Sequence, residues 1–182
     1  MRAWQVLRFI TKFFPKAELT ACDINQDGVD FCKNEFRAHP VYSKHNLKEF
    51  NIGKKFDLIW CGSLATHFDI NNTEDLLNFF HRHLNVGGLL VFSMHGRRVI
   101  EYLRTRECTY FLDNDSIEKI LSEVQESGYG YADYPGVKGY GISTAIPEWV
   151  KASLEKVGKW RNYRCAEMAW LHHHDIYSVV KE

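Results

Sequence analysis

Residues 17–25, which read AELTACDIN, decide the fold of this chain. An apolar run that ends in an acidic residue is typical of the second strand of nucleotide-binding α/β domains. At the tip of that strand, the carboxylate of Asp23 can accept hydrogen bonds from both hydroxyls of a ribose. In such folds a glycine-rich loop precedes the acid by about 20 residues, which would place that loop at or before Met1. The stretch therefore predicts an adenosyl-cofactor domain whose first strand and glycine loop are left out.

The composition is that of one ordered domain. The chain has 182 residues, of which 45% are hydrophobic, enough to bury one core. Basic and acidic side chains number 23 each, so no net charge attracts a polyanion, and nucleic acid is disfavoured as the main partner.

The cysteines and the N-terminal segment bear on the location of the protein. Five scattered cysteines without a CxxC pair fit a reducing cytoplasm better than a disulfide framework or a zinc site. No apolar run approaches the roughly 20 residues of a membrane span. Arg8 and Lys12 interrupt the apolar start of the chain and no small-residue cleavage site follows, so we expect no signal peptide.

Hydrophobic periodicity in the first half predicts alternating helices and strands. The predicted helices cover residues 2–13, 26–36 and about 73–84, and the predicted strands cover 17–23, 40–43, 56–61 and 89–94. The continuous apolar run at 56–61 is expected to be covered on both faces. Short alternating elements of this kind favour a parallel sheet with helices on both faces.

The second half has a different character. Asp115 and Glu118 form the pattern of a capping box for a helix that Gly128 ends. Residues 128–141, rich in glycine and tyrosine, are expected to form a mobile or substrate-facing loop. A strand at 141–146 and a helix at 147–157 follow. Two late strands, at 164–170 and 175–180, predict an antiparallel pair at one sheet edge.

The order of these motifs, with FDLIWCGS at 56–63 followed by LNVGGLLVFSMHG at 84–96, resembles the class I S-adenosylmethionine-dependent methyltransferases. The resemblance covers the whole chain and is strongest between Phe14 and Arg97. It implies a single domain over residues 1–182 with a Rossmann-like, mostly parallel sheet. It also implies helices on both faces, a C-terminal antiparallel strand pair and an N-terminal truncation that removes the first strand. The implied cofactor is S-adenosyl-L-methionine.

The resemblance assigns cofactor-binding roles to four residues near the second and third strands. Asp23 matches the ribose-binding acid, and Ile24 matches the residue that packs against the adenine. Asn46 with Leu47 matches the segment at the adenine edge. Two local alternatives remain open: Asp23 can cap the following helix, and Asn46 can be a turn residue.

The residues after the fourth strand of the family correspond to the place where cofactor and acceptor meet. Cys61, Gly62 and Ser63 occupy that segment here, and a glycine permits close approach of the backbone. A purely structural loop is the alternative for these three residues.

On the substrate side, the resemblance places His67 and Phe68 beside the reacting methyl group. Methyl transfer is an in-line displacement, so the enzyme contributes mostly orientation. A base is needed only for a hydroxyl or carbon acid, and His67 is the candidate for that catalytic role. His95 follows the next strand, at the rim where open α/β sheets bind ligands. A structural role is the alternative for both histidines.

No metal site is expected. His172, His173 and His174 are adjacent, but neighbours on a strand face opposite sides, and no cysteine or aspartate cluster joins them. A turn or the start of a strand is the predicted structure there.

The sequence therefore predicts an S-adenosylmethionine-dependent methyltransferase with a small or medium-sized acceptor, present as an incomplete chain with impaired cofactor binding. Met1 is either an internal methionine of a longer protein or the start of a remnant. A non-catalytic binding module of the same fold and a nicotinamide-dependent oxidoreductase are the alternatives. Because a missing central strand would expose apolar surface, we expect the N-terminal segment or a second copy of the chain to cover the gap. Neither nucleic acid nor membrane is an expected partner.

Overall fold

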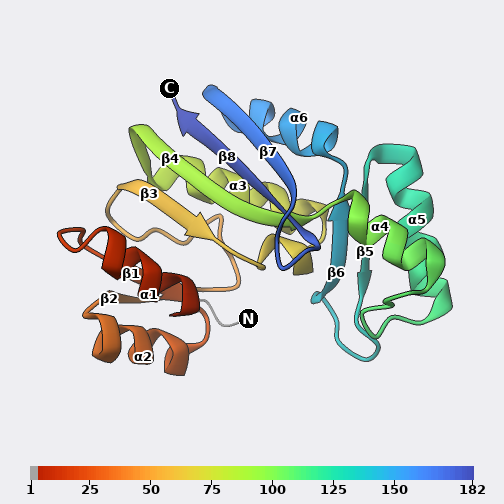
Figure 1. Ribbon diagram of the computed structural model, residues 1–182, viewed down its shortest axis with the longest axis horizontal. Helices are drawn as coiled ribbons and strands as arrows, with labels where there is room; N and C mark the ends of the chain where they lie inside the picture. The colour runs from red at the N-terminus through yellow and green to blue at the C-terminus, as the bar shows by residue number, and fades with distance from the viewer. Residues whose placement is uncertain (1–3) are drawn as a thin grey trace. The chain divides into compact units, whose positions relative to one another are not determined.

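The computed structural model describes residues 4–182, with side chains from residue 6 onward. The chain divides into two compact units, Met1–Gly53 and Lys54–Glu182, and each is described by itself. Figure 1 shows their elements. Among residues 4–182, no helix has the length and apolar character needed to cross a bilayer.

The first unit contains two helices and a pair of parallel strands. In chain order these are α1 (Trp4–Phe13), β1 (Thr20–Asp23), α2 (Gln26–Phe36) and β2 (His39–Tyr42). The predicted helix at 2–13 is α1, and its first two predicted residues lie outside the described part of the chain. Asn25 caps α2 by accepting a hydrogen bond from the Gly28 N–H at 2.9 Å. Asp23 is the last residue of β1, as the sequence predicts.

The second unit is built on a mixed sheet in the order β3-β4-β8-β7. Its strands are β3 (Phe56–Cys61), β4 (Leu84–His95), β7 (Trp160–Trp170) and β8 (His174–Lys181). β3 and β4 are parallel, whereas β8 runs antiparallel to both β4 and β7. The predicted antiparallel strand pair at the C-terminal end is confirmed. Helices α3 (Ile70–His83) and α6 (Pro147–Val157) pack together beside this sheet (Figure 1).

A smaller layer follows β4 in the chain. It contains α4 (Arg97–Thr105), α5 (Asn114–Ser127) and an antiparallel strand pair, β5 (Tyr129–Asp133) with β6 (Gly141–Ala145). A short helical turn, η1 (Ala65–His67), contacts both β4 and β6. The core of this layer is aliphatic, and its buried members are Val99, Leu103, Leu112, Ile117, Ile120, Ala132 and Ile142.

The expectation of a mobile or substrate-facing loop over residues 128–141 is wrong about the loop in its first part, because Tyr129–Asp133 is strand β5. Gly130 explains the difference. A Cβ atom there would lie 2.3 Å from the backbone oxygen of Ile120, so α5 and β5 approach too closely for any side chain. The glycine that suggested a loop is needed for close packing of a helix on a strand.

Two predicted helix starts also differ. The carboxylate of Asp113, rather than a box made by Asp115 and Glu118, caps α5 by accepting from the Ser116 N–H at 2.8 Å. Helix α3 begins at Ile70, three residues before the predicted start, because Asp69 caps it. In both cases an aspartate immediately before the first helical residue satisfies a backbone N–H that has no partner within the helix.

The expectation that strand 56–61 is covered on both faces is also wrong. β3 is an edge strand of the four-stranded sheet, and within residues 4–182 its ladder partner is β4. Leu58 of β3 is 39% exposed. The buried central strand is β4, in which Leu90, Phe92 and Met94 are fully buried.

Candidate functional site

The carboxyl ends of β3 and β4 form one rim of the sheet in the second unit. The two strands are parallel, so Cys61 and His95 end them on the same side, where open α/β sheets bind ligands. The backbone N–H of Ser63 donates to the Ser93 Oγ of β4 at 2.8 Å, which fixes the segment after β3 to the neighbouring strand. Ser63 has a positive φ of 59°, so the chain turns sharply there.

The Trp170 side chain, from the same unit, packs so closely against Gly62 that only a glycine fits there. A Cβ at Gly62 would lie 2.6 Å from the Trp170 ring. Trp170 also packs edge-on against Trp60, with ring centroids 5.7 Å apart. The end of β7 is thereby packed against the end of β3.

His67 lies in η1, where its ring is held in one orientation. Its Nδ1 is 2.8 Å from the backbone oxygen of Gly141, so Nδ1 carries the proton and donates it to that carbonyl. The ring stacks on Tyr140 at a centroid distance of 4.7 Å. Burial lowers the pKa of His67, and the hydrogen bond to Gly141 opposes that shift. At neutral pH the ring is therefore uncharged, with the lone pair of Nε2 available to accept a proton.

Phe68 is half-buried and contributes a backbone contact. Its carbonyl oxygen accepts a hydrogen bond from the Tyr129 hydroxyl at 2.7 Å, and the same hydroxyl lies 2.8 Å from the Thr73 Oγ1. These bonds join η1 and α3 to β5.

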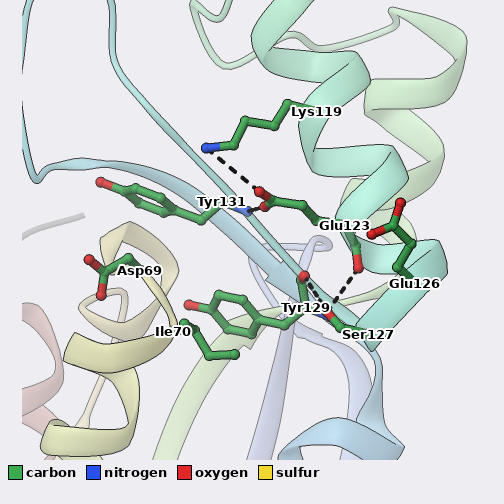
Figure 2. A pocket seen from close by; sticks show the side chains of 8 residues that line it. All are labelled: Asp69, Ile70, Lys119, Glu123, Glu126, Ser127, Tyr129 and Tyr131. Atoms are coloured by element: carbon green, nitrogen blue, oxygen red, sulfur yellow. Dashed lines mark hydrogen bonds and ion pairs between the residues drawn. The ribbon is translucent and has the colours of Figure 1, made fainter.

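Tyr129 also lines a pocket of about 280 Å³ between the start of α3 and α5 (Figure 2). The carboxylate of Glu123 on its wall accepts from the Tyr131 N–H at 2.9 Å and pairs with Lys119 at 3.6 Å. Polar and apolar groups both line the pocket, and none of the predicted site residues belongs to it.

Three histidines meet where β4 ends and β8 begins. His95 and His174 are opposite each other in the antiparallel ladder, with ring centroids 4.8 Å apart. His173 precedes β8, and its ring lies 4.5 Å from that of His174 and 5.7 Å from that of His95. One nitrogen of each ring lies within 4.8 Å of one nitrogen of the other two. We call His95, His173 and His174 the histidine cluster.

The turn before β8 explains why adjacent histidines lie together. Leu171 and His172 both have a positive φ, 56° and 60°, which places them in the left-handed region. Chain reversal through these residues brings His173 beside His174, while His172 remains exposed. The prediction of a turn and a strand start is confirmed, but the expectation that neighbouring rings face opposite sides is wrong for His173 and His174.

Each ring of the histidine cluster has an oxygen partner at Nδ1. His95 Nδ1 lies 3.1 Å from the Ser143 carbonyl oxygen, and His173 Nδ1 lies 2.6 Å from that of Leu171. His174 Nδ1 is 3.2 Å from the Ser93 Oγ. Carbonyl oxygens only accept, so at His95 and His173 the proton is on Nδ1 and the Nε2 lone pair is available.

Burial and mutual proximity favour the uncharged forms of His95 and His174. Burial is the main cause that lowers the pKa of His95 well below its ordinary value, and the charges of His174 and His173 add to it. Burial likewise lowers the pKa of His174 to about 4, with contributions from the charges of His173 and His67. These two buried rings are therefore uncharged at pH 7.

In the first unit, the predicted adenosine-side residues make local hydrogen bonds. Asp23 Oδ1 accepts from the Asn25 N–H at 2.9 Å, and Asn46 Oδ1 accepts from the Lys48 N–H at 3.1 Å. Ile24 is 48% exposed, and Leu47 is half-buried. A carboxylate has about four acceptor positions, so the bond to Asn25 leaves Asp23 able to accept further donors.

Comparison with known proteins identifies the fold. Residues 5–90 match a family model described as a methyltransferase domain. A solved S-adenosylmethionine-dependent methyltransferase from Clostridium acetobutylicum aligns with 97% of this chain and 79% of its own, at a TM-score of 0.59 and 15% identity. The chain has the class I methyltransferase fold. This confirms the resemblance predicted from the sequence.

Two further methyltransferases resemble this chain over smaller shares of their own length. Human N-acetylserotonin methyltransferase, solved with S-adenosylmethionine, aligns with 98% of this chain and 45% of its own, at a TM-score of 0.58 and 14% identity. The malonyl-[acyl-carrier protein] O-methyltransferase of Bacillus cereus is 25% identical over 95 residues, 52% of this chain. The chain thus spans 35% of the length of that curated relative.

The sequence predicted His67 beside the reacting methyl group and His95 at the rim, but missed their partners. His173 and His174 reach His95 through the register of β4 with β8, and Tyr134 and Tyr140 reach His67 through the β5–β6 connection. The one available signal was that polar residues end several adjacent strands.

Proposed function

We propose that this chain is an S-adenosylmethionine-dependent methyltransferase, or the larger part of its catalytic domain, acting on a small or medium-sized acceptor. The observation that carries the proposal is the class I methyltransferase fold with an uncharged, oriented histidine at the carboxyl rim of its sheet. Of the relatives named above, one is described as an N-acetylserotonin methyltransferase and one as a malonyl-[acyl-carrier protein] O-methyltransferase.

The residues of the first unit fit the adenosyl part of the cofactor. Asp23 ends β1 with an exposed carboxylate that retains acceptor capacity, and it would hold the ribose hydroxyls. Ile24 offers an exposed apolar side chain for the adenine face, with Asn46 and Leu47 at the adenine edge. When bound, the cofactor supplies an electrophilic methyl group on a sulfonium centre.

The residues of the second unit would handle the acceptor. Cys61, Gly62 and Ser63 form the end of β3 and the segment after it, and Phe68 and His95 would lie on the substrate side. His67 would accept the proton of a hydroxyl or carbon acid at Nε2, because its Nδ1 proton is committed to Gly141. Such proton transfer would raise the nucleophilicity of the acceptor atom as it attacks.

A cytoplasmic location is part of the proposal. Cys22, Cys32, Cys108 and Cys165 are free thiols. Free thiols persist where the surroundings are reducing.

Calorimetric titration of the full chain with S-adenosylhomocysteine and with NAD⁺ tests the proposal. Because the sequence predicts impaired cofactor binding, we expect S-adenosylhomocysteine to bind weakly and NAD⁺ not to bind. Asp23→Ala should weaken the binding of S-adenosylhomocysteine by about tenfold or more, since hydrogen bonds to a charged group contribute roughly 1.5–3 kcal/mol. Asp23→Asn keeps an acceptor for the Asn25 N–H, so it measures the effect of the negative charge on binding while the local turn stays intact. Asp27→Ala, which removes an exposed carboxylate in the first turn of α2, is the matched control and should leave the affinity unchanged.

Preference for NAD⁺ would support the oxidoreductase alternative and refute the proposal. Binding of neither compound would refute it in favour of a non-catalytic module. Equal affinities for Asp23→Ala and Asp27→Ala would remove the ribose-binding role of Asp23.

A further inference from the structure

We propose that the histidine cluster is a binding site for a divalent transition-metal ion of the Zn²⁺ type, held by His95, His173 and His174. This site does not depend on the proposed methyl transfer, because it is inferred from the geometry of the three histidines alone. The proposal differs from the sequence-based expectation of no metal.

The arrangement of the three rings carries the inference. One nitrogen of each lies within 4.8 Å of one nitrogen of the other two. The centre of a triangle with that side is about 2.8 Å from its corners, whereas a Zn–N bond is about 2.0–2.1 Å. Each nitrogen must therefore move inward by about 0.7 Å at most, a shift within reach of ring rotation about χ2.

The partners of the opposite ring nitrogens are those that metal-binding histidines use. Ligating histidines usually donate their second N–H to a carbonyl, carboxylate or water, which fixes the tautomer and orients the ring. His95 donates Nδ1–H to the Ser143 carbonyl, and His173 donates to the Leu171 carbonyl. Ser93 Oγ is positioned to accept from His174 Nδ1 at 3.2 Å. The three Nε2 atoms are then the available ligands.

The support around the cluster is rigid. His95 and His174 are 3% and 2% exposed and face each other across the β4–β8 ladder. His173 is half-buried and gives the site access to solvent. Tyr110 packs on His95 and His173, with ring centroids at 5.3 Å and 6.1 Å.

The donor set selects the class of metal. Imidazole nitrogens suit Zn²⁺, Cu²⁺, Ni²⁺ and Fe²⁺, whereas Mg²⁺ and Ca²⁺ require oxygen ligands. Three protein nitrogens leave a tetrahedral ion with one open position, the arrangement of zinc sites that bind a water or a substrate oxygen. At this rim, the fourth ligand of the bound ion would therefore be an exchangeable water or substrate oxygen.

Competition of the full chain with a chromophoric chelator for Zn²⁺ tests the site. The protein is first stripped of metal, and we expect one equivalent of Zn²⁺ to bind and Mg²⁺ not to compete. His173→Ala should weaken the affinity by at least about 100-fold, because loss of a direct ligand exceeds the 10–100-fold effect of losing an outer partner. His172→Ala is the matched control: it removes an exposed neighbouring imidazole and should leave the affinity unchanged.

A second variant keeps the test decisive if His173→Ala fails to fold. His173→Gln retains a polar side chain of similar length and removes the imidazole. It should abolish the Zn²⁺-dependent rise in melting temperature that we expect for the unsubstituted chain. Zn²⁺ affinity that is equal in His173→Ala, His172→Ala and the unsubstituted chain would overturn the proposal. So would the absence of any stoichiometric Zn²⁺ binding.

Discussion

Replacement of Tyr129 by phenylalanine should destabilise the second unit, because one buried hydroxyl joins three elements. The Tyr129 side chain is 3% exposed, and its hydroxyl bonds the Phe68 carbonyl at 2.7 Å and the Thr73 Oγ1 at 2.8 Å. Thr73 is fully buried, so Tyr129→Phe leaves its hydroxyl without this partner. A buried polar group left unpaired costs about 1–3 kcal/mol. We expect the free energy of unfolding to fall by that amount.

Tyr131→Phe is the matched control. Tyr131 lies two residues further along β5, and its hydroxyl donates to the Asp133 carboxylate at 2.6 Å in an exposed position. Water replaces that bond when the hydroxyl is removed, so the change in stability should stay within about 0.5 kcal/mol. The two variants delete the same atom from the same strand and differ in burial.

Urea unfolding followed by tryptophan fluorescence measures both variants. Four of the five tryptophans, Trp60, Trp149, Trp160 and Trp170, belong to the second unit, so fluorescence reports its unfolding. The slope with urea should be unchanged, which separates lost stability from an altered denatured state. Combining Tyr129→Phe with Thr73→Val should cost less than the sum of the single changes, since both partners of one bond are then removed. Equal stabilities of Tyr129→Phe and Tyr131→Phe would refute the reasoning.

Two further predictions concern the rim of the sheet. His67→Ala should lower the rate of methyl transfer to the acceptor by about 10²–10⁴-fold, and His172→Ala is the control that should leave this rate unchanged. Because burial lowers the pKa of His67, the unsubstituted protein should keep its activity below pH 6.5 and lose it only as the pH falls through that lowered pKa. A loss of activity that begins at or above pH 6.5 would contradict this. Gly96→Ala should destabilise the second unit by about 1–3 kcal/mol, because a Cβ would lie 1.7 Å from the buried carboxylate of Asp175. Gly28→Ala is the control: a Cβ there would meet no heavy atom nearer than 3.5 Å, so the variant should be neutral or slightly more stable. Thermal melts in which Gly28→Ala is the less stable variant would reject the steric argument.

Two elements whose apolar residues follow one period were predictable to the residue. The helix over Gln26–Phe36 and the strand over Phe56–Cys61 have the predicted limits. Their limits are set locally, by the Asn25 cap and by the polar residues that flank the strand. The fold class followed from the order of such elements.

Features that depend on contacts between distant segments were not predictable from periodicity. Strand β5 contains Gly130, which local rules assign to a turn, yet its place is set by the approach of α5. Helix α4 was not predicted, because its apolar residues, Val99, Ile100 and Leu103, are few among charged neighbours and find their partners in α5 and β6.

The histidine cluster shows why a local rule failed at the rim. Alternation of side chains holds only while the backbone stays extended, and Leu171 and His172 leave that region for positive φ. Non-glycine residues in the left-handed region cost free energy and persist only where the surrounding structure holds them. Here Trp170, immediately before the turn, is packed against Gly62 after β3, and His174, immediately after it, is paired with His95 of β4. The turn is therefore fixed on both sides by the strand ends that form the rim, and the packing that holds the turn also brings the three imidazoles together.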